Sequence, residues 1–537
     1  MNQETTTNGD CAFAESVVEN QRQLASALKP HYDFIVCGAG SSGSVVAGQL
    51  AANPDVSVLL LEAGGSDDLE TVMNPNQWPA NLGSGLDWNF VAEPNPHLNG
   101  RAIPYSMGKV LGGGGSINVC TWSRGHKADW DYFAEAASDP GWNYKSVLDL
   151  YQRIENYGGS SGHNGSRSRM WVQPAQNPHP FYTAVLESMS AQGICRFDRL
   201  SGELWEAPHG CTYVDEIVHD GRRQSPFRSY VYPKMGQPNL TVLTNTVVTR
   251  ILLEGQRATG IEFIRNGRVA HVHASLETIL SLGAVHTPKI LMQSGIGDEA
   301  KLKPFDIPIR QHLPGVGRHL HDHVSISCAW EASDVDMPTA PRGQAVCFWK
   351  TDPALELPNA LAFAAPIIPV TGENSAKFHL PALGWSLVAG MATEGRGELF
   401  LTGRSPSDPV RIETNFMAER KDLQTALEVI AMCRHIGNGE ALRPFVKREV
   451  LPGDLQTAEM EQFIRDGIVT FWHQSGGTRM GSDSMSVVDG QLRVRGIEGI
   501  RVADASIMPR VTVGNTMAPC VVIGERASDL LKAQHGV

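Results

Sequence analysis

The chain of 537 residues contains no hydrophobic segment that is long enough to cross a membrane. Its longest apolar stretch, residues 360–370, is interrupted by Pro366 and Pro369, whereas a membrane-spanning helix needs about 20 apolar residues. The first twelve residues carry no basic region followed by an apolar core, so we expect no secretory signal peptide. These absences predict a cytoplasmic protein.

Strongly basic stretches and paired cysteines are also missing. The formal net charge is −12, which disfavours nucleic acid and anionic membranes as partners. The nine cysteines include no Cys-x-x-Cys pair, and an odd number of scattered cysteines without a signal peptide predicts reduced thiols. With 42% hydrophobic and 19% charged residues, the composition is that of a soluble globular protein, and the length indicates two domains.

A strand–helix–strand unit occupies residues 31–62. Residues 34–37 predict a buried parallel strand, residues 44–51 a helix, and residues 56–61 a second strand that ends at Glu62. A Gly-x-Gly-x-x-Gly turn separates the first strand from the helix. Glycines in this place, followed at this distance by an acid, are typical of a dinucleotide-binding unit, and the turn alone fits NAD as well as FAD.

Each glycine of that turn has a separate expected role. Gly38 allows the tight turn, Gly40 lets the backbone approach a pyrophosphate, and Gly43 permits close packing of helix and strand. Free N–H groups at the start of the helix would face the phosphates, and Glu62 would accept hydrogen bonds from a ribose.

Five further motifs resemble those of one flavoenzyme family. They are Gly108-Lys-Val-Leu-Gly-Gly-Gly-Gly-Ser-Ile-Asn118 and the segments at residues 283–297, 314–323, 502–509 and 514–519. They are similar, in kind and in order, to the motifs of the glucose–methanol–choline (GMC) oxidoreductases, from about Tyr32 to the end of the chain. The resemblance implies FAD bound in an extended pose and an alcohol as the hydride donor.

The resemblance also implies which residues contact the FAD. They are Gly38, Gly40, Ser41, Ser42, Gly43, Glu62, Ala63, Val110, Gly115, Asn118, Val119, Val248, Trp472, Asp504, Ala505, Thr516 and Met517. The glycine run 112–115 would let the backbone lie flat against a large planar cofactor. Some members of the family carry, at the position of Ile117, a histidine that is covalently bonded to the flavin. Isoleucine cannot form that bond, so we expect FAD to be held non-covalently.

His473 and Asn515 are the candidate catalytic residues. Oxidation of an alcohol needs a base for the hydroxyl proton, and histidine titrates near neutral pH. The matching positions of the family hold His–His or His–Asn pairs. Asn515 could donate a hydrogen bond to the same oxygen, or it could cap the helix expected at residues 516–531. The positive end of that helix would favour negative charge on the reduced flavin.

Three alternating histidines, His319, His321 and His323, would lie on one face of a strand and could bind a metal. The resemblance implies a structural loop beside the cofactor instead, so we predict no metal site.

The expected fold is α/β, with a Rossmann-like FAD-binding domain and a second, mostly antiparallel-sheet domain for the substrate. Helices are expected at 13–28, docked on the FAD domain, and at 417–436; a strand at 397–402 would belong to the substrate sheet, and 156–169 reads as a loop. The expected organisation is an N-terminal extension (1–30), an N-terminal GMC module (31–320) with a substrate-domain insertion at about 150–235, a mainly substrate-binding part (321–480), and a return to the FAD domain (481–537), the C-terminal GMC module covering about 393–530.

The sequence therefore predicts FAD-dependent oxidation of a small-molecule alcohol to an aldehyde or ketone, with O2 or another acceptor taking the electrons. Two alternatives stay open, a hydroxynitrile-lyase-type enzyme with a non-redox FAD and a flavin-binding protein without chemistry. The alcohol and the oligomeric state also stay open. Apolar residues that could line a substrate pocket are Met107, Trp122, Phe348, Trp349, Trp385 and Trp472.

Overall fold

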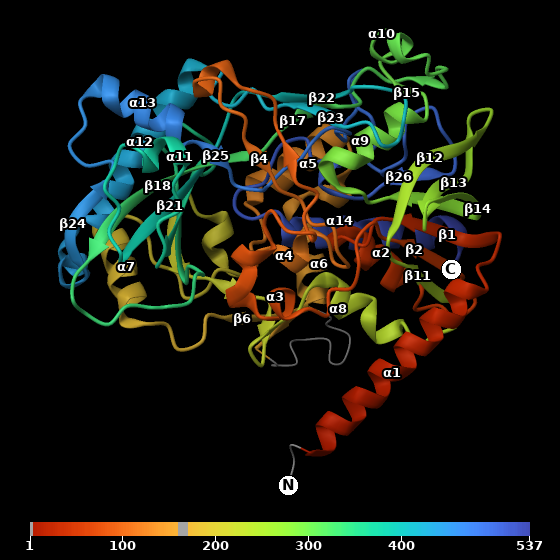
Figure 1. Ribbon diagram of the computed structural model, residues 1–537, viewed down its shortest axis with the longest axis horizontal. Helices are drawn as coiled ribbons and strands as arrows, with labels where there is room; N and C mark the ends of the chain where they lie inside the picture. The colour runs from red at the N-terminus through yellow and green to blue at the C-terminus, as the bar shows by residue number, and fades with distance from the viewer. Residues whose placement is uncertain (1–3, 159–169) are drawn as a thin grey trace.

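The computed structural model describes residues 4–158 and 170–537, with side chains from residue 12 onward. Most of the expected loop at 156–169 therefore lies outside the described residues. The two largest sheets each have seven strands, and they occupy opposite sides of the molecule in Figure 1. The α/β class and the division into a Rossmann-like unit and an antiparallel sheet are confirmed.

The first sheet has the order β11-β2-β1-β14-β13-β12, with β26 paired to β14. Its strands are β1 (His31–Cys37), β2 (Val58–Leu61), β11 (Leu240–Leu243), β12 (Thr246–Glu254), β13 (Arg257–Arg265), β14 (Arg268–Leu280) and β26 (Ile500–Val502). The pairs β11–β2, β2–β1, β1–β14 and β14–β26 are parallel. The interior strands are buried on both faces, which explains why residues 34–37 and 58–61 are uninterrupted apolar runs.

Two helices cover this sheet beside the glycine turn. They are α2 (Ser41–Leu50) and α14 (Met517–His535), the last helix of the chain. Gly524 of α14 lies so close to α2 that a Cβ at this position would stand 2.7 Å from the Ser42 carbonyl oxygen. The last helix of the chain thereby returns to the first βαβ unit, and its N-terminus reaches the end of β1 where a dinucleotide would lie.

The second large sheet is antiparallel, in the order β24-β18-β21-β20-β19-β7, with β25 paired to β18. Its strands are β7 (Gly210–Tyr213), β18 (His323–Ala332), β19 (Ala345–Trp349), β20 (Ala360–Ala365), β21 (Gly384–Ala392), β24 (Val446–Leu451) and β25 (Val469–Thr470). Helices α7 (Pro180–Ala191), α12 (Arg420–Gly437) and α13 (Thr457–Gly467) lie beside it in Figure 1. Trp330 and Trp385 stack at 4.5 Å within this layer.

Two expected elements after residue 390 differ from the structure. The strand at 397–402 is observed as β22 (Gly397–Leu401), but it pairs with β17 (Arg318–Leu320) and β23 (Val410–Glu413) in a separate three-stranded sheet. Its assignment to the substrate sheet was wrong. The helix expected from residue 417 begins at Arg420, because Met417 has a positive φ of 60° that a helix does not accept.

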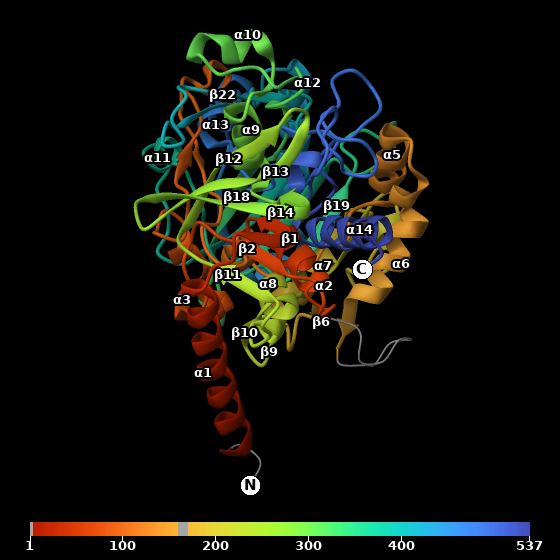
Figure 2. The ribbon, with the colours of Figure 1, turned by 90° about the vertical axis from the view of Figure 1, so that its right-hand side faces the viewer.

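The N-terminal helix α1 (Glu4–Ser26) is longer than expected and projects from the body in Figures 1 and 2. Its C-terminal half docks on the Rossmann-like sheet through Gln21. The amide of Gln21 donates to the Leu240 carbonyl at 3.0 Å and accepts from the Val242 N–H at 2.8 Å. The side chain therefore satisfies backbone groups at the edge strand β11.

Candidate active site

One large cavity, with a volume of about 1040 Å³, runs from the glycine turn after β1 to the antiparallel sheet. Small-molecule sites usually occupy about 300–1,000 Å³, so the cavity has room for an extended dinucleotide and a second molecule. The N-terminal part of α2, the end of β2 and the start of α14 border one part of it, and strands β18, β20 and β21 border another.

The glycine turn leaves open space where a pyrophosphate would lie. A Cβ on Gly40 would meet no atom within 4 Å, although this residue borders the cavity. Gly113, from the glycine run, packs against the other side of the turn, since a Cβ there would stand 2.8 Å from the Gly40 Cα. The two glycine segments therefore lie directly against each other, and the exposed backbone of Gly40 fits a phosphate group.

Glu62 ends β2 at the border of the cavity. Its carboxylate accepts from the Ala39 N–H at 3.0 Å and from the Gly64 N–H at 2.8 Å. Burial raises the pKa of Glu62 to about 7, against the lowering effect of these backbone donors. A buried carboxylate with remaining acceptor capacity fits the hydroxyl groups of a ribose, which would donate to it and favour its charged form.

Fifteen of the seventeen residues expected to contact FAD border this cavity. The exceptions are Gly43 and Val110. Gly43 faces the protein interior, where a Cβ would stand 2.0 Å from the Gly38 carbonyl oxygen. Val110 is fully buried and forms a parallel bridge with Gly65. These two residues shape the cavity without lining it.

His473 and Asn515 meet at the other part of the cavity, although 42 residues separate them in the sequence. The Asn515 Nδ2 atom lies 3.2 Å from His473 Nε2. The Ser123 hydroxyl donates to Asn515 Oδ1 at 3.1 Å, which fixes the orientation of the amide. Asn515 therefore does not cap α14, which begins at Met517 without a side-chain cap. Because an amide nitrogen only donates, His473 Nε2 presents its lone pair to Asn515 and to the cavity.

Two neighbours hold the His473 ring and backbone in place. The Nδ1 atoms of His323 and His473 are 3.0 Å apart, so one of them carries a proton; with Nε2 accepting, that proton is on His473 in the neutral ring. The His473 N–H donates to Asp322 Oδ1 at 2.8 Å, and Thr470 donates to the other oxygen at 2.5 Å. The contacts of His323 and Asp322 with His473, and of Ser123 with Asn515, were not predicted from the sequence.

Burial sets the charge of this cluster. It lowers the pKa of His473 well below its usual value of 6.5, and the neighbouring His323 adds to the effect. Burial also lowers the pKa of His323, to about 4. Both rings are therefore neutral at neutral pH, and His473 Nε2 is able to accept a proton.

The three alternating histidines do not share a strand face. His319 belongs to β17 and has a positive φ of 62°, β18 begins at His323, and His321 lies between the two strands. His321 accepts from the Val511 N–H at 3.2 Å, and its Nε2 lies 3.0 Å from the Thr393 carbonyl oxygen, so both ring nitrogens are engaged. Among the residues that the structure describes, no group of His, Cys, Asp and Glu could hold a metal ion. The absence of a metal stays a prediction.

Only two of the six residues proposed for a substrate pocket border the cavity. These are Met107 and Trp472. The remaining four, Trp122, Phe348, Trp349 and Trp385, are buried in the packed interior. Sequence reasoning missed the rings that do border the cavity near His473, which are Trp78, Phe363 and Phe471. Phe471 lies 5.1 Å from the His473 ring, measured between centroids.

Two family models, both described as GMC oxidoreductase, match residues 32–325 and 393–524. The chain belongs to the GMC oxidoreductase family. It is 34% identical to an oxygen-dependent choline dehydrogenase of Citrobacter koseri, over 94% of this chain and 96% of the relative. Among solved structures, pyridoxine 4-oxidase from Mesorbium loti matches with a TM-score of 0.87 and 29% identity, over 94% of this chain and 99% of the other. A fungal aryl-alcohol oxidase, at 19% identity and a TM-score of 0.80, shares the fold.

As a GMC oxidoreductase, the protein is an FAD-dependent enzyme of the alcohol oxidase or dehydrogenase type. The glycine turn, the open space at Gly40 and the buried carboxylate of Glu62 suit the diphosphate and ribose of this cofactor. No helix in the described parts of the chain is both long and apolar enough to cross a membrane.

Proposed function

We propose that this GMC oxidoreductase converts an alcohol into an aldehyde or ketone at His473 and Asn515. The observation that carries the proposal is that His473 Nε2 and Asn515 Nδ2 lie 3.2 Å apart at the border of the same cavity that the glycine turn borders. One atom can accept a proton and the other can donate a hydrogen bond, and a single hydroxyl oxygen needs both.

The protein's residues have distinct tasks in this reaction. The neutral His473 takes the hydroxyl proton on Nε2, while the Asn515 amide donates to the oxygen as negative charge develops there. The His473 Nδ1–H group then donates to His323, which holds the ring in one orientation and stabilises its positive charge. Bound FAD supplies the acceptor for the hydride, and O2 or another oxidant takes the electrons from it.

The start of α14 contributes through its position. Thr516 and Met517 border the cavity next to Asn515. The N-terminus of a helix carries about half a positive charge, so this end stabilises negative charge on the substrate oxygen or on a neighbouring group. We also assign Ser41 and Ser42 at the start of α2, and Ala63 after β2, to cofactor binding, because all three border the cavity.

Anaerobic mixing of the purified holoenzyme with a panel of alcohols tests the proposed function. At least one alcohol should bleach the flavin absorbance, and the product should be the corresponding aldehyde or ketone. Repetition in air with peroxide detection separates an oxidase from a dehydrogenase. If the flavin stays oxidised with every alcohol but the enzyme cleaves a cyanohydrin, the lyase alternative is favoured instead.

We also predict that the FAD is not covalently attached. Ile117 borders the cavity at the end of α4 (Gly114–Ile117) and has no nucleophilic atom. Cys520 also borders it, but burial raises the pKa of its thiol to about 12, so the reactive thiolate is absent at neutral pH. Acid precipitation should release all of the flavin into the supernatant as FAD. Flavin absorbance that stays with the precipitated chain would contradict this.

A further inference from the structure

The antiparallel sheet turns one face toward His473, and its side chains form the wall of the substrate space. In register across the strands, His323 lies opposite Ala392, Ser325 opposite Gly390, and Ser327 opposite Val388. Val388 in turn pairs with Phe363. Because side chains alternate between the two faces of a strand, Ser325, Ser327, Val388 and Phe363 share the face of His323, and all four border the cavity.

This wall carries no charge. Ala365 at the end of β20 and the following residues Ile367, Pro369 and Val370 continue the wall. The rings of Phe471 and Trp78 border the same cavity. Its polar groups include the hydroxyls of Ser325 and Ser327, which have no hydrogen-bond partner among the described side chains and backbone groups. A substrate placed here meets apolar surface and neutral hydroxyl groups.

The carboxylates that border the cavity are Glu62, Glu373 and Asp504. Glu62 lies at the dinucleotide end, where it accepts from the Ala39 and Gly64 N–H groups. Asp504 accepts from the Gly283 N–H at 2.9 Å, from Thr287 at 2.6 Å and from the Ser506 N–H at 2.8 Å. Glu373, about half exposed, faces Arg101 at 3.4 Å. These three are the carboxylates among the described side chains that border the cavity.

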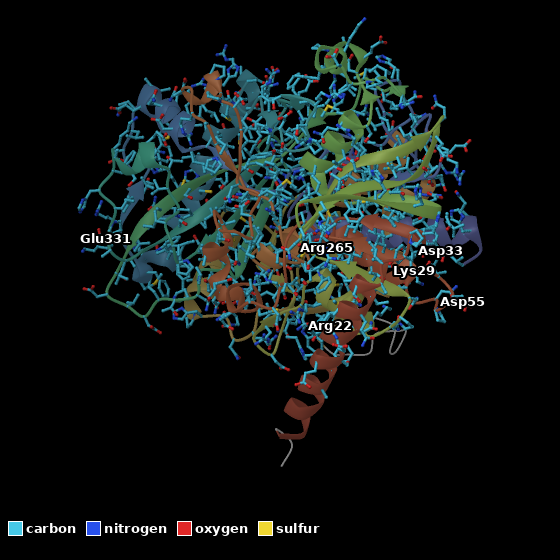
Figure 3. All side chains as sticks on the ribbon, turned by 45° about the vertical axis from the view of Figure 1, so that its right-hand side comes forward. Arg22, Lys29, Asp33, Asp55, Arg265 and Glu331 are labelled. Atoms are coloured by element: carbon cyan, nitrogen blue, oxygen red, sulfur yellow. The ribbon has the colours of Figure 1, made fainter. Side chains whose placement is uncertain are left out.

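Cations are equally scarce along this cavity. Arg101 is the one Lys or Arg residue among the described residues that border it. Beside its contact with Glu373, it donates to the backbone carbonyls of Arg465 and Ile468 at 2.8 and 3.0 Å. The next carboxylate along β18, Glu331, is paired with Lys447 and Arg448 and lies at the outer edge of the molecule (Figure 3). Apart from the dinucleotide end, the charged Lys, Arg, Asp and Glu side chains among the described residues that border the cavity are therefore Arg101 and Glu373, and they are paired with each other.

We infer that the substrate is an uncharged alcohol with an apolar aromatic or branched aliphatic body, and that cationic alcohols such as choline are poor substrates. This inference rests on the proposed function, since it names the alcohol that His473 and Asn515 receive. The inferred substrate differs from choline, the substrate in the name of the relative that is 34% identical to this chain.

The physical reason is the cost of desolvating an unpaired cation. A quaternary ammonium group that enters this space loses water and gains no carboxylate from the sheet wall, and Glu373 at the border of the cavity is already paired with Arg101. The aromatic faces of Phe471 and Trp78 offer cation–π attraction, which recovers part of that loss. The positive end of α14 opposes a cation in the same cavity. A neutral body of the same shape loses only its unfavourable contact with water.

Choline and 3,3-dimethylbutan-1-ol provide the matched test, because they differ only in a charged nitrogen against a neutral carbon. With the holoenzyme under anaerobic conditions, the ratio of the limiting rate of flavin reduction to the dissociation constant should be at least about tenfold higher for the neutral alcohol. A ratio that favours choline overturns the inference.

Two variants of one wall residue sharpen the test. Ser327→Asp places a carboxylate on the sheet face. It should raise the choline preference, which is the value of this ratio for choline divided by that for the neutral alcohol, by about tenfold relative to wild type. Ser327→Asn, of similar shape and without charge, should leave the preference unchanged. Equal preferences in the two variants would show that charge at this wall does not select the substrate.

The same data distinguish this inference from the proposed function. Reduction of the flavin by either alcohol upholds the proposed oxidation, and only the ratio decides the charge of the substrate. If no alcohol of the panel, these two and benzyl alcohol included, reduces the flavin, the proposed function fails. The dissociation constants from flavin spectral changes then still compare the neutral and the charged molecule, and tighter binding of choline would overturn the neutral pocket.

Discussion

His473→Ala should slow flavin reduction by an alcohol about 10²- to 10⁴-fold, the usual contribution of a positioned base. The variant loses the one nitrogen that can accept the hydroxyl proton beside Asn515. It should retain FAD, because the glycine turn and Glu62 belong to the other part of the cavity. Rapid-reaction absorbance under anaerobic conditions measures the limiting rate directly, with the flavin spectrum as the control for cofactor content.

Asn515→Ala should cost less, about 10- to 10³-fold, because one hydrogen-bond donor is lost while the base remains. The losses in the double variant should not add in free energy, since both groups act on one oxygen. Additive losses would indicate that the two side chains serve different steps. A His473→Ala enzyme that keeps its flavin and reduces it at a near-normal rate would show that another group is the base.

The pH dependence of the wild type is the independent readout of this assignment. The ring pKa lies well below 6.5, so the base form is already complete at neutral pH and is lost only as the pH falls through that lowered pKa. The limiting rate of reduction should therefore be flat from about neutral pH upward and should decline on the acid side. A rise centred near the ordinary histidine pKa, which the sequence alone would suggest, would mean that burial does not control His473.

The parts of the fold that follow local patterns could be predicted from the sequence. The apolar runs and the glycine spacing of residues 31–62 predict the βαβ unit, and the structure contains it as β1, α2 and β2. The membership of β22 in a small separate sheet could not be predicted in this way. It depends on pairing with β17, whose residues lie about 80 positions earlier, and no local period encodes such a partner.

The candidate site shows the same division. His473 and Asn515 stand in motifs that resemble those of a family, and the structure brings them together. His323 was missed because its position depends on where a strand begins. Val324 pairs with Thr470 across the sheet, and this long-range register sets His323 against His473. Periodicity along residues 319–323 suggested a continuous strand instead, which the positive φ of His319 interrupts.

Packing by distant segments also decides which aromatic side chains border the cavity. Phe348 and Phe363 lie on the same face of the antiparallel sheet, but only Phe363 borders the cavity. Phe348 packs instead against Trp205, with ring centroids 5.0 Å apart. The sequence shows that both residues are apolar, whereas the packing of a distant segment over one of them determines their roles.

Alanine substitutions of three glycines should distinguish effects on the stability of the glycine turn from effects on FAD affinity. At Gly43 a Cβ would stand 2.0 Å from the Gly38 carbonyl oxygen and 2.9 Å from the Ser281 Cβ. Gly43→Ala must therefore push α2 away from the turn, and we expect a loss of about 1–3 kcal/mol in the stability of the apoprotein, together with loss of FAD on gel filtration.

Gly40→Ala should behave differently, because the same added methyl group meets only the cavity. A φ of −70° at this position is open to alanine, and no protein atom lies within 4 Å of its Cβ. Apart from the small cost of a poorer helix cap, the apoprotein should melt as the wild type does. If a pyrophosphate approaches the backbone here, the methyl group collides with it, and FAD affinity should fall about 10- to 100-fold.

Gly236→Ala, at an exposed turn with open space around its Cβ, is the matched control and should alter neither property. Undiminished FAD affinity in Gly40→Ala, measured by titration of the apoprotein with fluorescence detection, would place the pyrophosphate elsewhere in the cavity.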